Sequence, residues 1–232
     1  MLRKLKNVIR RFGRPPLHRP TIAREHIVLG SEYGGWPLVS DLVNSSATVF
    51  SFGIGEDITF DIAAIRKYGC KVYGFDPTPR SQHWIQAQNL PEAFVFFPVG
   101  IGAKDGDAEF FAPANAGHVS YSLTPRDTEA PSQRIFAPIL RLETILDKYK
   151  LSPPDVLKMD IEGFEYAVLD DILAGSIRPS LILVEFHHGI YSSIEPAQTN
   201  NAVEALREAG YELFYVSPGG HEYGFVWIGS GA

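Results

Sequence analysis

Acidic and histidine side chains follow two apolar runs in the second half of the chain, and their types suit acid–base or metal chemistry. Asp160 and Glu162 come after the run VLKM, and Glu185, His187 and His188 come after the run LILV. If these runs are neighbouring strands of a parallel sheet, the side chains converge at its carboxyl edge, where open α/β sheets bind ligands. A histidine at that edge can accept a proton from a bound hydroxyl at neutral pH.

A loop with two glycines follows the first apolar run of the central region. In SFGIGEDITFD, Gly53 and Gly55 match the start of a dinucleotide fingerprint, but Ile58 stands where the third glycine is expected. Glu56 and Asp57 fall in the expected first turn of a helix, where acids stabilise many ordinary helices. They also repel a pyrophosphate and attract a cation. The loop therefore favours a cationic, nucleotide-like ligand, and S-adenosylmethionine fits that description.

Asp76 ends the next strand-like run, KVYGF, where a carboxylate can accept both hydroxyls of a ribose. The alternative is an exposed turn aspartate before Pro77, which is common in sequences such as DPTP. Ribose binding does not distinguish NAD from S-adenosylmethionine. The acids beside the glycines do, and they favour S-adenosylmethionine.

The elements that must position these residues alternate along the chain. From residue 48 onward, strand-like runs alternate with helical patterns, which is typical of βα units around a parallel sheet. The last two runs flank PGGHE and predict an antiparallel β-hairpin, a feature of the methyltransferase variant of this architecture. Residues 103–138 predict a surface insertion with one strand, AEFFA. The main expected strands are 48–52, 71–75, 93–99, 155–161, 180–186, 211–217 and 223–229, and the expected helices are about 58–68, 81–88, 164–173 and 198–209.

Charge is unevenly distributed along the 232 residues. Residues 1–20 hold seven Lys and Arg and no acid, which leaves 14 of the 21 bases against 27 acids. So acidic a body argues against a nucleic-acid partner. Residues 1–20 predict a basic tail, which either lies as an amphipathic helix on an anionic membrane or is solvated. Residues 21–47 predict a helical or loop extension, and residues 48–232 predict the main domain.

The run VLKMDIEGFEYAVL, residues 156–169, closely resembles the signature of FkbM-type methyltransferases. VFSFGIGEDITFD and VYGFDPTP resemble the cofactor-binding segments of that family, in the same order. The resemblance covers about residues 48–190. It implies an α/β, class I, Rossmann-like methyltransferase fold, S-adenosylmethionine as methyl donor, and usually a hydroxyl acceptor on a saccharide or secondary metabolite.

The resemblance also assigns residues to the donor. By position, Gly53 and Gly55 form the cofactor turn, Asp76 binds the ribose, and Gly100 lies near the adenine. Ser51 departs from the family's pattern, because an acid is common at the start of the glycine motif. Contact with the methionine end therefore falls to one of the two acids after the loop. The predicted cofactor-binding residues are Gly53, Gly55, Glu56, Asp57, Asp76, Pro77, Gly100 and Asp160.

Methyl transfer to oxygen requires an aligned acceptor and commonly the removal of its proton. We predict Asp160, Glu185 and His187 as catalytic residues, with His187 as the base and Glu185 orienting it. Structural alternatives are that Glu162 caps the helix from Gly163 and that Glu185 is a paired structural acid. The same cluster could instead hold Mg, Mn or Zn. No tight ligand spacing supports a metal, and we predict none.

Several alternatives stay open at this level. YGGW, residues 33–36, could fold over the cofactor, or Trp36 could pack in the core. An NAD-dependent oxidoreductase and a catalytically silent nucleotide-binding module are rival classes. The expected partner is a small-molecule or glycan acceptor of unknown identity. No run is apolar enough for a membrane helix or a secretory signal, so we expect a cytoplasmic protein whose one membrane contact, if any, is peripheral and made by residues 1–20.

Overall fold

The structure is a computed structural model that describes residues 16–111 and 134–229. The basic segment that predicts an amphipathic helix falls almost entirely on residues 1–15, outside the described part of the chain. Within the described ranges, no helix is both long enough and apolar enough to cross a membrane.

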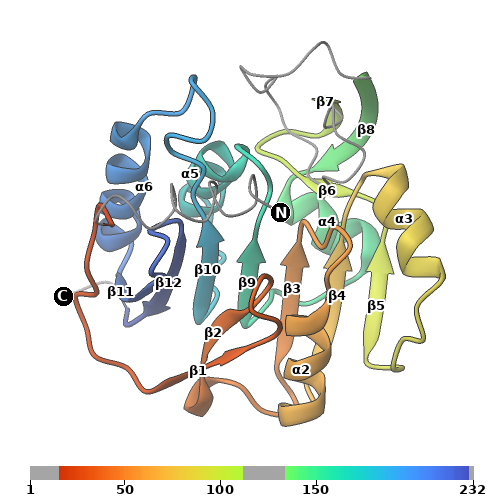
Figure 1. The fold of residues 1–232 in the computed structure, drawn as a ribbon, viewed down its shortest axis with the longest axis horizontal. Coiled ribbons are helices and arrows are strands. Elements are labelled where there is room, and N and C mark those ends of the chain that lie inside the picture. The colour runs from red at the N-terminus through yellow and green to blue at the C-terminus, as the bar shows by residue number, and fades with distance from the viewer. Residues whose placement is uncertain (1–15, 112–133, 230–232) are drawn as a thin grey trace, which may run out of the picture.

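A seven-stranded sheet forms the centre of the fold (Figure 1). Its strand order is β11-β12-β10-β9-β3-β4-β5, and the pairs from β10 to β5 are parallel, whereas β12 is antiparallel to both of its neighbours. The prediction of a mostly parallel sheet with a C-terminal antiparallel hairpin is therefore confirmed. The strands are β3 (Thr48–Phe52), β4 (Lys71–Phe75), β5 (Phe94–Phe97), β9 (Val156–Met159), β10 (Leu181–Glu185), β11 (Tyr211–Val216) and β12 (Glu222–Trp227).

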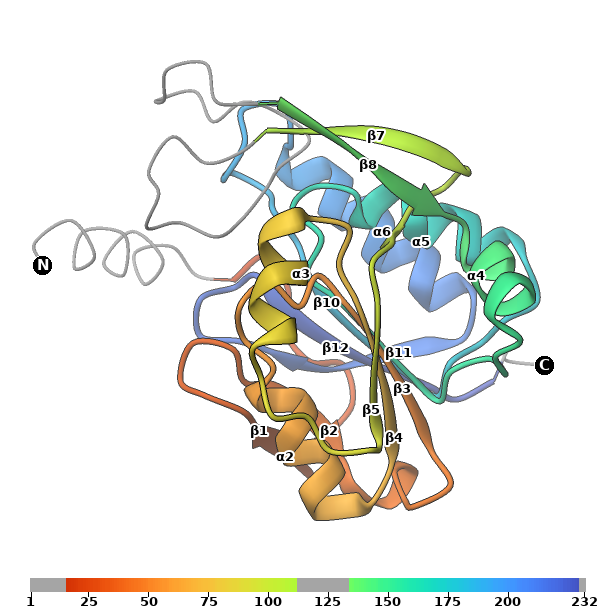
Figure 2. The same cartoon turned by 90° about the vertical axis from the view of Figure 1, so that its right-hand side faces the viewer.

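Other elements pack on both faces of this sheet, and each face contributes to its own hydrophobic core. Successive side chains of a strand point to opposite faces, so Phe50 and Phe52 of β3 join one core and Val49 joins the other. Figure 2 shows α4, α5 and α6 on the first face and α2 on the second. Burial on both faces explains the unbroken apolar run of β10. The helices are α2 (Thr59–Tyr68), α3 (Pro79–Gln86), α4 (Leu142–Tyr149), α5 (Glu165–Ala174) and α6 (Pro196–Glu208).

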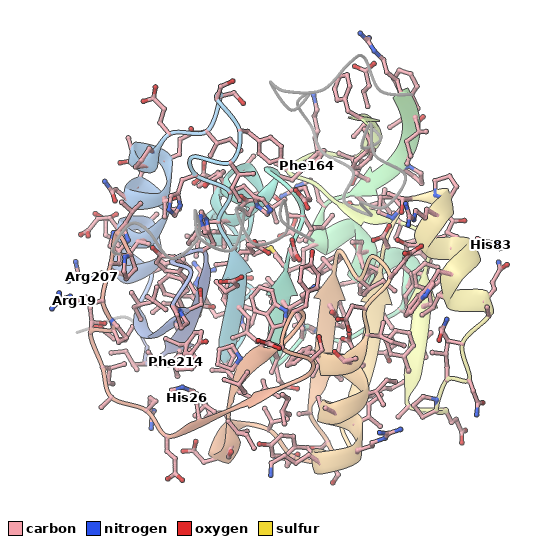
Figure 3. The ribbon with its side chains drawn as sticks, in the orientation of Figure 1. Arg19, His26, His83, Phe164, Arg207 and Phe214 are labelled. Carbon is pink, nitrogen blue, oxygen red and sulfur yellow. The ribbon has the colours of Figure 1, made fainter. Side chains whose placement is uncertain are left out.

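The segment 21–47 differs from the predicted helical or loop extension. It forms an antiparallel hairpin of β1 (His26–Leu29) and β2 (Trp36–Val39), followed by the short 3-10 helix η1 (Ser40–Leu42). All four residues of β2 are buried, because the hairpin packs on the second face of the sheet as part of the core. His26 lies beside Phe214 of β11, with ring centroids 5.7 Å apart (Figure 3).

A small three-stranded sheet lies at the carboxyl end of the main sheet (Figure 1). It consists of β6 (Gly100–Ile101), β8 (Arg134–Leu140) and β7 (Gly106–Phe111), in that order. β7 contains most of the predicted AEFFA strand, whereas β8 was not predicted. Phe110 of β7 stacks on Phe164, which is labelled in Figure 3, with centroids 5.4 Å apart. This contact ties the small sheet to the loop that follows β9.

Candidate active site

The glycine loop after β3 has the backbone conformation that glycine permits. Gly53 and Gly55 have φ of +74° and +53°, in the left-handed region that side chains rarely adopt. A Cβ at Gly53 would lie 1.7 Å from the carbonyl oxygen of Asp160. A Cβ at Gly55 would meet no atom within 4 Å. The first glycine therefore permits a close backbone contact, and the second leaves open space.

Asp76 lies directly beneath this loop. Its Oδ2 accepts a hydrogen bond from the Gly55 N–H at 3.0 Å, and its Oδ1 accepts from the backbone and hydroxyl of Thr78 at 2.9 and 2.6 Å. The side chain is buried, so the alternative of an exposed turn aspartate is wrong. Burial raises the pKa of Asp76 more than these hydrogen bonds lower it. The structure thus brings Asp76 to the glycine loop, as the sequence predicts.

Glu56 and Asp57 do not lie in the first turn of a helix, because α2 begins at Thr59. Glu56 accepts hydrogen bonds from Arg80 Nε and Nη2 at 2.8 and 3.1 Å. This contact lowers the pKa of Glu56. Asp57 accepts from the backbone and hydroxyl of Thr59 and from the Ser31 hydroxyl. Burial raises the pKa of Asp57, but these hydrogen bonds outweigh the effect of burial, so the pKa is lowered from its ordinary value. Both acids stay charged beside the loop and already hold protein donors.

The tip of the β1–β2 hairpin contacts the same loop. The backbone N–H of Ser31 donates to the Thr59 hydroxyl at 2.9 Å, and a Cβ at Gly34 would lie 2.6 Å from Asp57 Oδ2. Tyr33 at the tip is 76% exposed, whereas Trp36 is 4% exposed and belongs to the core. For YGGW, core packing by Trp36 is therefore correct, and Gly34 lies against Asp57 beside the loop.

Gly100 and Pro77, both assigned to the donor, are neighbours. A Cβ at Gly100 would lie 3.1 Å from Pro77 Cγ, so the glycine permits close packing of β6 against the end of β4. Ser51, the departure from the family's pattern, is fully buried within β3.

Lys158 of β9 is a site residue that the sequence reasoning missed. It is buried, and its Nζ donates to the carbonyl oxygens of Phe52 and Gly53 at 3.3 and 3.1 Å. Nζ also lies over the Trp36 ring, 5.4 Å from its centroid. A single lysine inside the apolar run VLKM was the signal that could have found it, because unpaired lysines are rarely buried.

The predicted acid–histidine cluster does assemble at the ends of β9 and β10. His187 Nε2 lies 3.4 Å from Glu162 Oε2 and 3.8 Å from Asp160 Oδ1. Its Nδ1 and its backbone nitrogen lie 3.1 and 3.0 Å from Glu165 Oε1. Glu165 is fully buried at the start of α5 and was not predicted. One ligand-type atom each of Asp160, Glu185 and His187 lies within 4.8 Å of the others.

Glu162 adopts a left-handed backbone conformation with φ of +53°, which carries its carboxylate to His187 and to the Tyr191 hydroxyl. The helix that it was considered to cap begins at Glu165 rather than Gly163. Glu165 also accepts from the Gly163 N–H at 2.8 Å. The turn between β9 and α5 is thus shaped around His187.

The surroundings of His187 shift its pKa from the ordinary value. Burial lowers the pKa of His187, but the charges of Glu165 and Glu162 outweigh burial and raise it well above the ordinary value. These charges favour the protonated form of His187 in the ligand-free protein. Burial also raises the pKa of Asp160, against the lowering effect of Lys158.

His188 does not join this cluster. Its Nδ1 contacts the Thr199 hydroxyl at 3.0 Å, and its ring stacks on His221 at 4.8 Å. Burial, followed by the charges of neighbouring histidines, lowers its pKa to about 4. His188 is therefore a neutral side chain that serves as a natural comparison for His187.

Known proteins resemble this chain in sequence and in fold. Probable methyltransferase-like protein 24 is 25% identical in Homo sapiens and 26% identical in Rattus norvegicus, over 152 residues that make up 65% of this chain. The match spans 35% of the length of those relatives. Methyltransferase FkbM from Methylobacillus flagellatus KT aligns with a TM-score of 0.48 and 14% identity, over 79% of this chain and 44% of that chain. Aeropyrum pernix fibrillarin, solved with natively bound S-adenosyl-L-methionine, aligns with a TM-score of 0.41 and 11% identity, over 80% of this chain and 66% of that chain.

The model of the methyltransferase FkbM domain matches residues 50–213. This range is more than half of the chain. It contains the glycine loop, Asp76 and the whole acid–histidine cluster. The chain therefore belongs to the FkbM family of methyltransferases.

Proposed function

We propose that this methyltransferase transfers the methyl group of S-adenosylmethionine to a hydroxyl oxygen on a saccharide or secondary metabolite. One observation carries the proposal. The glycine loop and the acid–histidine cluster share a border, because the carbonyl of Asp160 lies against Gly53 and its carboxylate lies against His187. A donor at the loop and an acceptor at the cluster would therefore be neighbours.

The residues around the loop fit S-adenosylmethionine. The space next to Gly55 is open, and the Asp76 carboxylate lies one hydrogen bond away from that glycine. In this proposal, Asp76 binds the ribose, Gly100 with Pro77 lies near the adenine, and Glu56 or Asp57 attracts the charged methionine end. When bound, S-adenosylmethionine supplies an electrophilic methyl group.

The cluster supplies groups that can hold a hydroxyl. Carboxylate oxygens of Asp160 and Glu162 accept hydrogen bonds, and the nearby Nε2 of His187 donates or accepts one according to its protonation. A hydroxyl both donates and accepts, so it can be oriented by both kinds of group at once. In this proposal, the cluster of His187 and its neighbouring acids takes up the proton of the hydroxyl.

Calorimetry with S-adenosylhomocysteine and NAD is the first test. We expect saturable binding of S-adenosylhomocysteine and none of NAD. Binding of neither would favour the catalytically silent module.

Turnover is the second test, in a screen of hydroxylated glycans and metabolites with mass spectrometric detection of O-methyl products. His187→Ala should reduce turnover by about 100-fold, the usual scale for acid–base groups, with unchanged affinity for S-adenosylhomocysteine. His188→Ala is the matched control and should retain turnover. Equal turnover in both variants would remove His187 from the acceptor site.

A further inference from the structure

We propose that Asp160, Glu185 and His187 form a binding site for one divalent cation of the Mn²⁺ or Zn²⁺ type. The role that we give the cation, polarising the acceptor hydroxyl, rests on the proposed function. The site itself rests on the geometry of three side chains, which does not depend on what the acceptor is.

The three side chains are close enough to share an ion. One ligand-type atom from each lies within 4.8 Å of the other two. Nitrogen and oxygen atoms bound to one such ion at about 2.0 to 2.2 Å lie at most about 4.4 Å apart. Small side-chain rotations therefore close the set on an ion. The ligands lie at or just beyond the ends of β9 and β10, which pair in parallel within the main sheet.

His187 is oriented as metal-binding histidines usually are. Its Nδ1 side is held by Glu165, whose Oε1 also accepts the backbone N–H of His187 at 3.0 Å. Glu165 lies outside the ligand set and is fully buried. A ligating histidine almost always donates its other ring N–H to a carboxylate or carbonyl, which fixes the tautomer and the ring plane. The arrangement leaves Nε2 facing the carboxylates of Glu162 and Asp160, at 3.4 and 3.8 Å.

The surroundings carry excess negative charge that a cation would offset. The charges of Lys158 and His187 act on Asp160, and so do the charges of Glu162 and Glu165. Glu185 of β10 stands directly opposite Glu222 of β12 in the antiparallel pair, an arrangement that destabilises a sheet when both groups are charged. Four carboxylates contact or act electrostatically on His187: Glu162, Glu165, Asp160 and Glu185.

The donor atoms indicate which cations fit. Two carboxylates and one imidazole form a mixed oxygen and nitrogen set, which suits Mn²⁺ or Zn²⁺. Ca²⁺, in contrast, is typically bound by oxygen atoms alone. With three protein ligands, the ion keeps an open position. A hydroxyl bound there becomes more acidic, as water does on a catalytic metal ion.

The test titrates Mn²⁺, and separately Zn²⁺, into the full chain after chelator treatment and dialysis. Free Mn²⁺ is followed by electron paramagnetic resonance, and Zn²⁺ by calorimetry. We expect one saturable site per chain. Glu185→Gln and His187→Gln should each weaken binding at least 10-fold. Glu165→Gln should weaken it by about 10-fold to 100-fold through the orientation of His187. His188→Gln is the matched control and should bind as the wild type does.

Circular dichroism of each variant checks that it is folded, and Asp160→Asn serves if Glu185→Gln is not. Absence of saturable binding of either ion overturns the proposal. So does equal binding by wild type and the folded ligand variants. S-adenosylhomocysteine affinity is measured on the same metal-free protein. If the nucleotide binds and the ions do not, the metal site is wrong and the proposed function stands. If the ions bind and the nucleotide does not, the proposed function is wrong and the metal site stands.

Discussion

The carbonyl oxygen of Asp160 lies so close to Gly53 that a Cβ built on this glycine would be only 1.7 Å from that oxygen. Next to this contact, the backbone N–H of Asp160 donates to the Phe52 carbonyl at 3.1 Å. The end of β9 is thus held against the start of the glycine loop by main-chain atoms. The spacing between the proposed donor and acceptor sides is therefore set by the backbone of two neighbouring strands.

Substitution of the two glycines should separate this structural role from a binding role. In Gly53→Ala, the new Cβ would collide with the backbone of Asp160. The alanine would also have to adopt a left-handed φ, which alone costs about 1 to 3 kcal/mol. We expect a large loss of thermal stability and of S-adenosylhomocysteine binding. Gly55→Ala has a similar φ but meets no atom within 4 Å. We expect it to fold with a smaller loss, about 1 to 2 kcal/mol, yet to bind the nucleotide at least 10-fold more weakly. Unchanged affinity in Gly55→Ala would mean that the open space is not the donor site.

Asp76→Ala should weaken S-adenosylhomocysteine binding by about 1.5 to 3 kcal/mol, the scale of hydrogen bonds to a charged group. The measurement is calorimetry at pH 7. Because Asp76 also holds Gly55 and Thr78, Thr78→Val is needed as the control. It removes one of these bonds and the side-chain cap of α3, at a cost of about 1 kcal/mol in stability. Nucleotide affinity should change little. An equal loss of affinity in both variants would assign Asp76 a structural role only.

Glu56 should make a pH-dependent contribution to stability. The hydrogen bonds from Arg80 lower its pKa from the ordinary value of 4.5, so the folded state favours the carboxylate. A depressed carboxyl pKa gives stability that is present above the unfolded pKa and lost as the pH falls through the folded pKa. We expect wild type to exceed Glu56→Gln in unfolding free energy by up to about 1 kcal/mol at pH 6 to 7. This difference should shrink as the pH falls below 4.5 and vanish once the folded-state carboxyl is protonated, as measured by urea unfolding. A difference that is constant with pH would refute the ion pair as its source.

The sheet was predictable because its signals are local. Val49, Phe50 and Phe52 alternate between two buried faces, and the chain's runs show this period without reference to other segments. The N-terminal hairpin was not predictable in this way. Its strands have four residues each and become regular only by packing on the sheet. Short strands that depend on tertiary contacts give weak sequence signals.

The membership of the acid–histidine cluster was partly predictable, but its electrostatics were not. Asp160 and His187 follow adjacent strands, which is why their meeting could be expected. Glu165 looks in sequence like an ordinary first-turn acid of α5, and only the fold brings it to His187, 22 residues away. The raised pKa of His187 depends on that contact and on Glu162. A pattern in the sequence does not reveal which charges surround a buried group.

The last prediction concerns Lys158, a buried cation. Its charge needs nearby acceptors or acids, and it stabilises the charge of those acids in turn. Burial raises the pKa of Asp61, and the charge of Lys158 opposes part of that rise. Lys158→Met removes that charge and two hydrogen bonds to the glycine loop. We expect a loss of about 3 to 5 kcal/mol, because a buried acid is left uncompensated. Adding Asp61→Asn should recover a substantial part of this loss, measured as a double-mutant cycle by urea unfolding at pH 7. Additive losses would show that the charges of Lys158 and Asp61 are not coupled, and that Lys158 stabilises the fold through its bonds to the loop carbonyls.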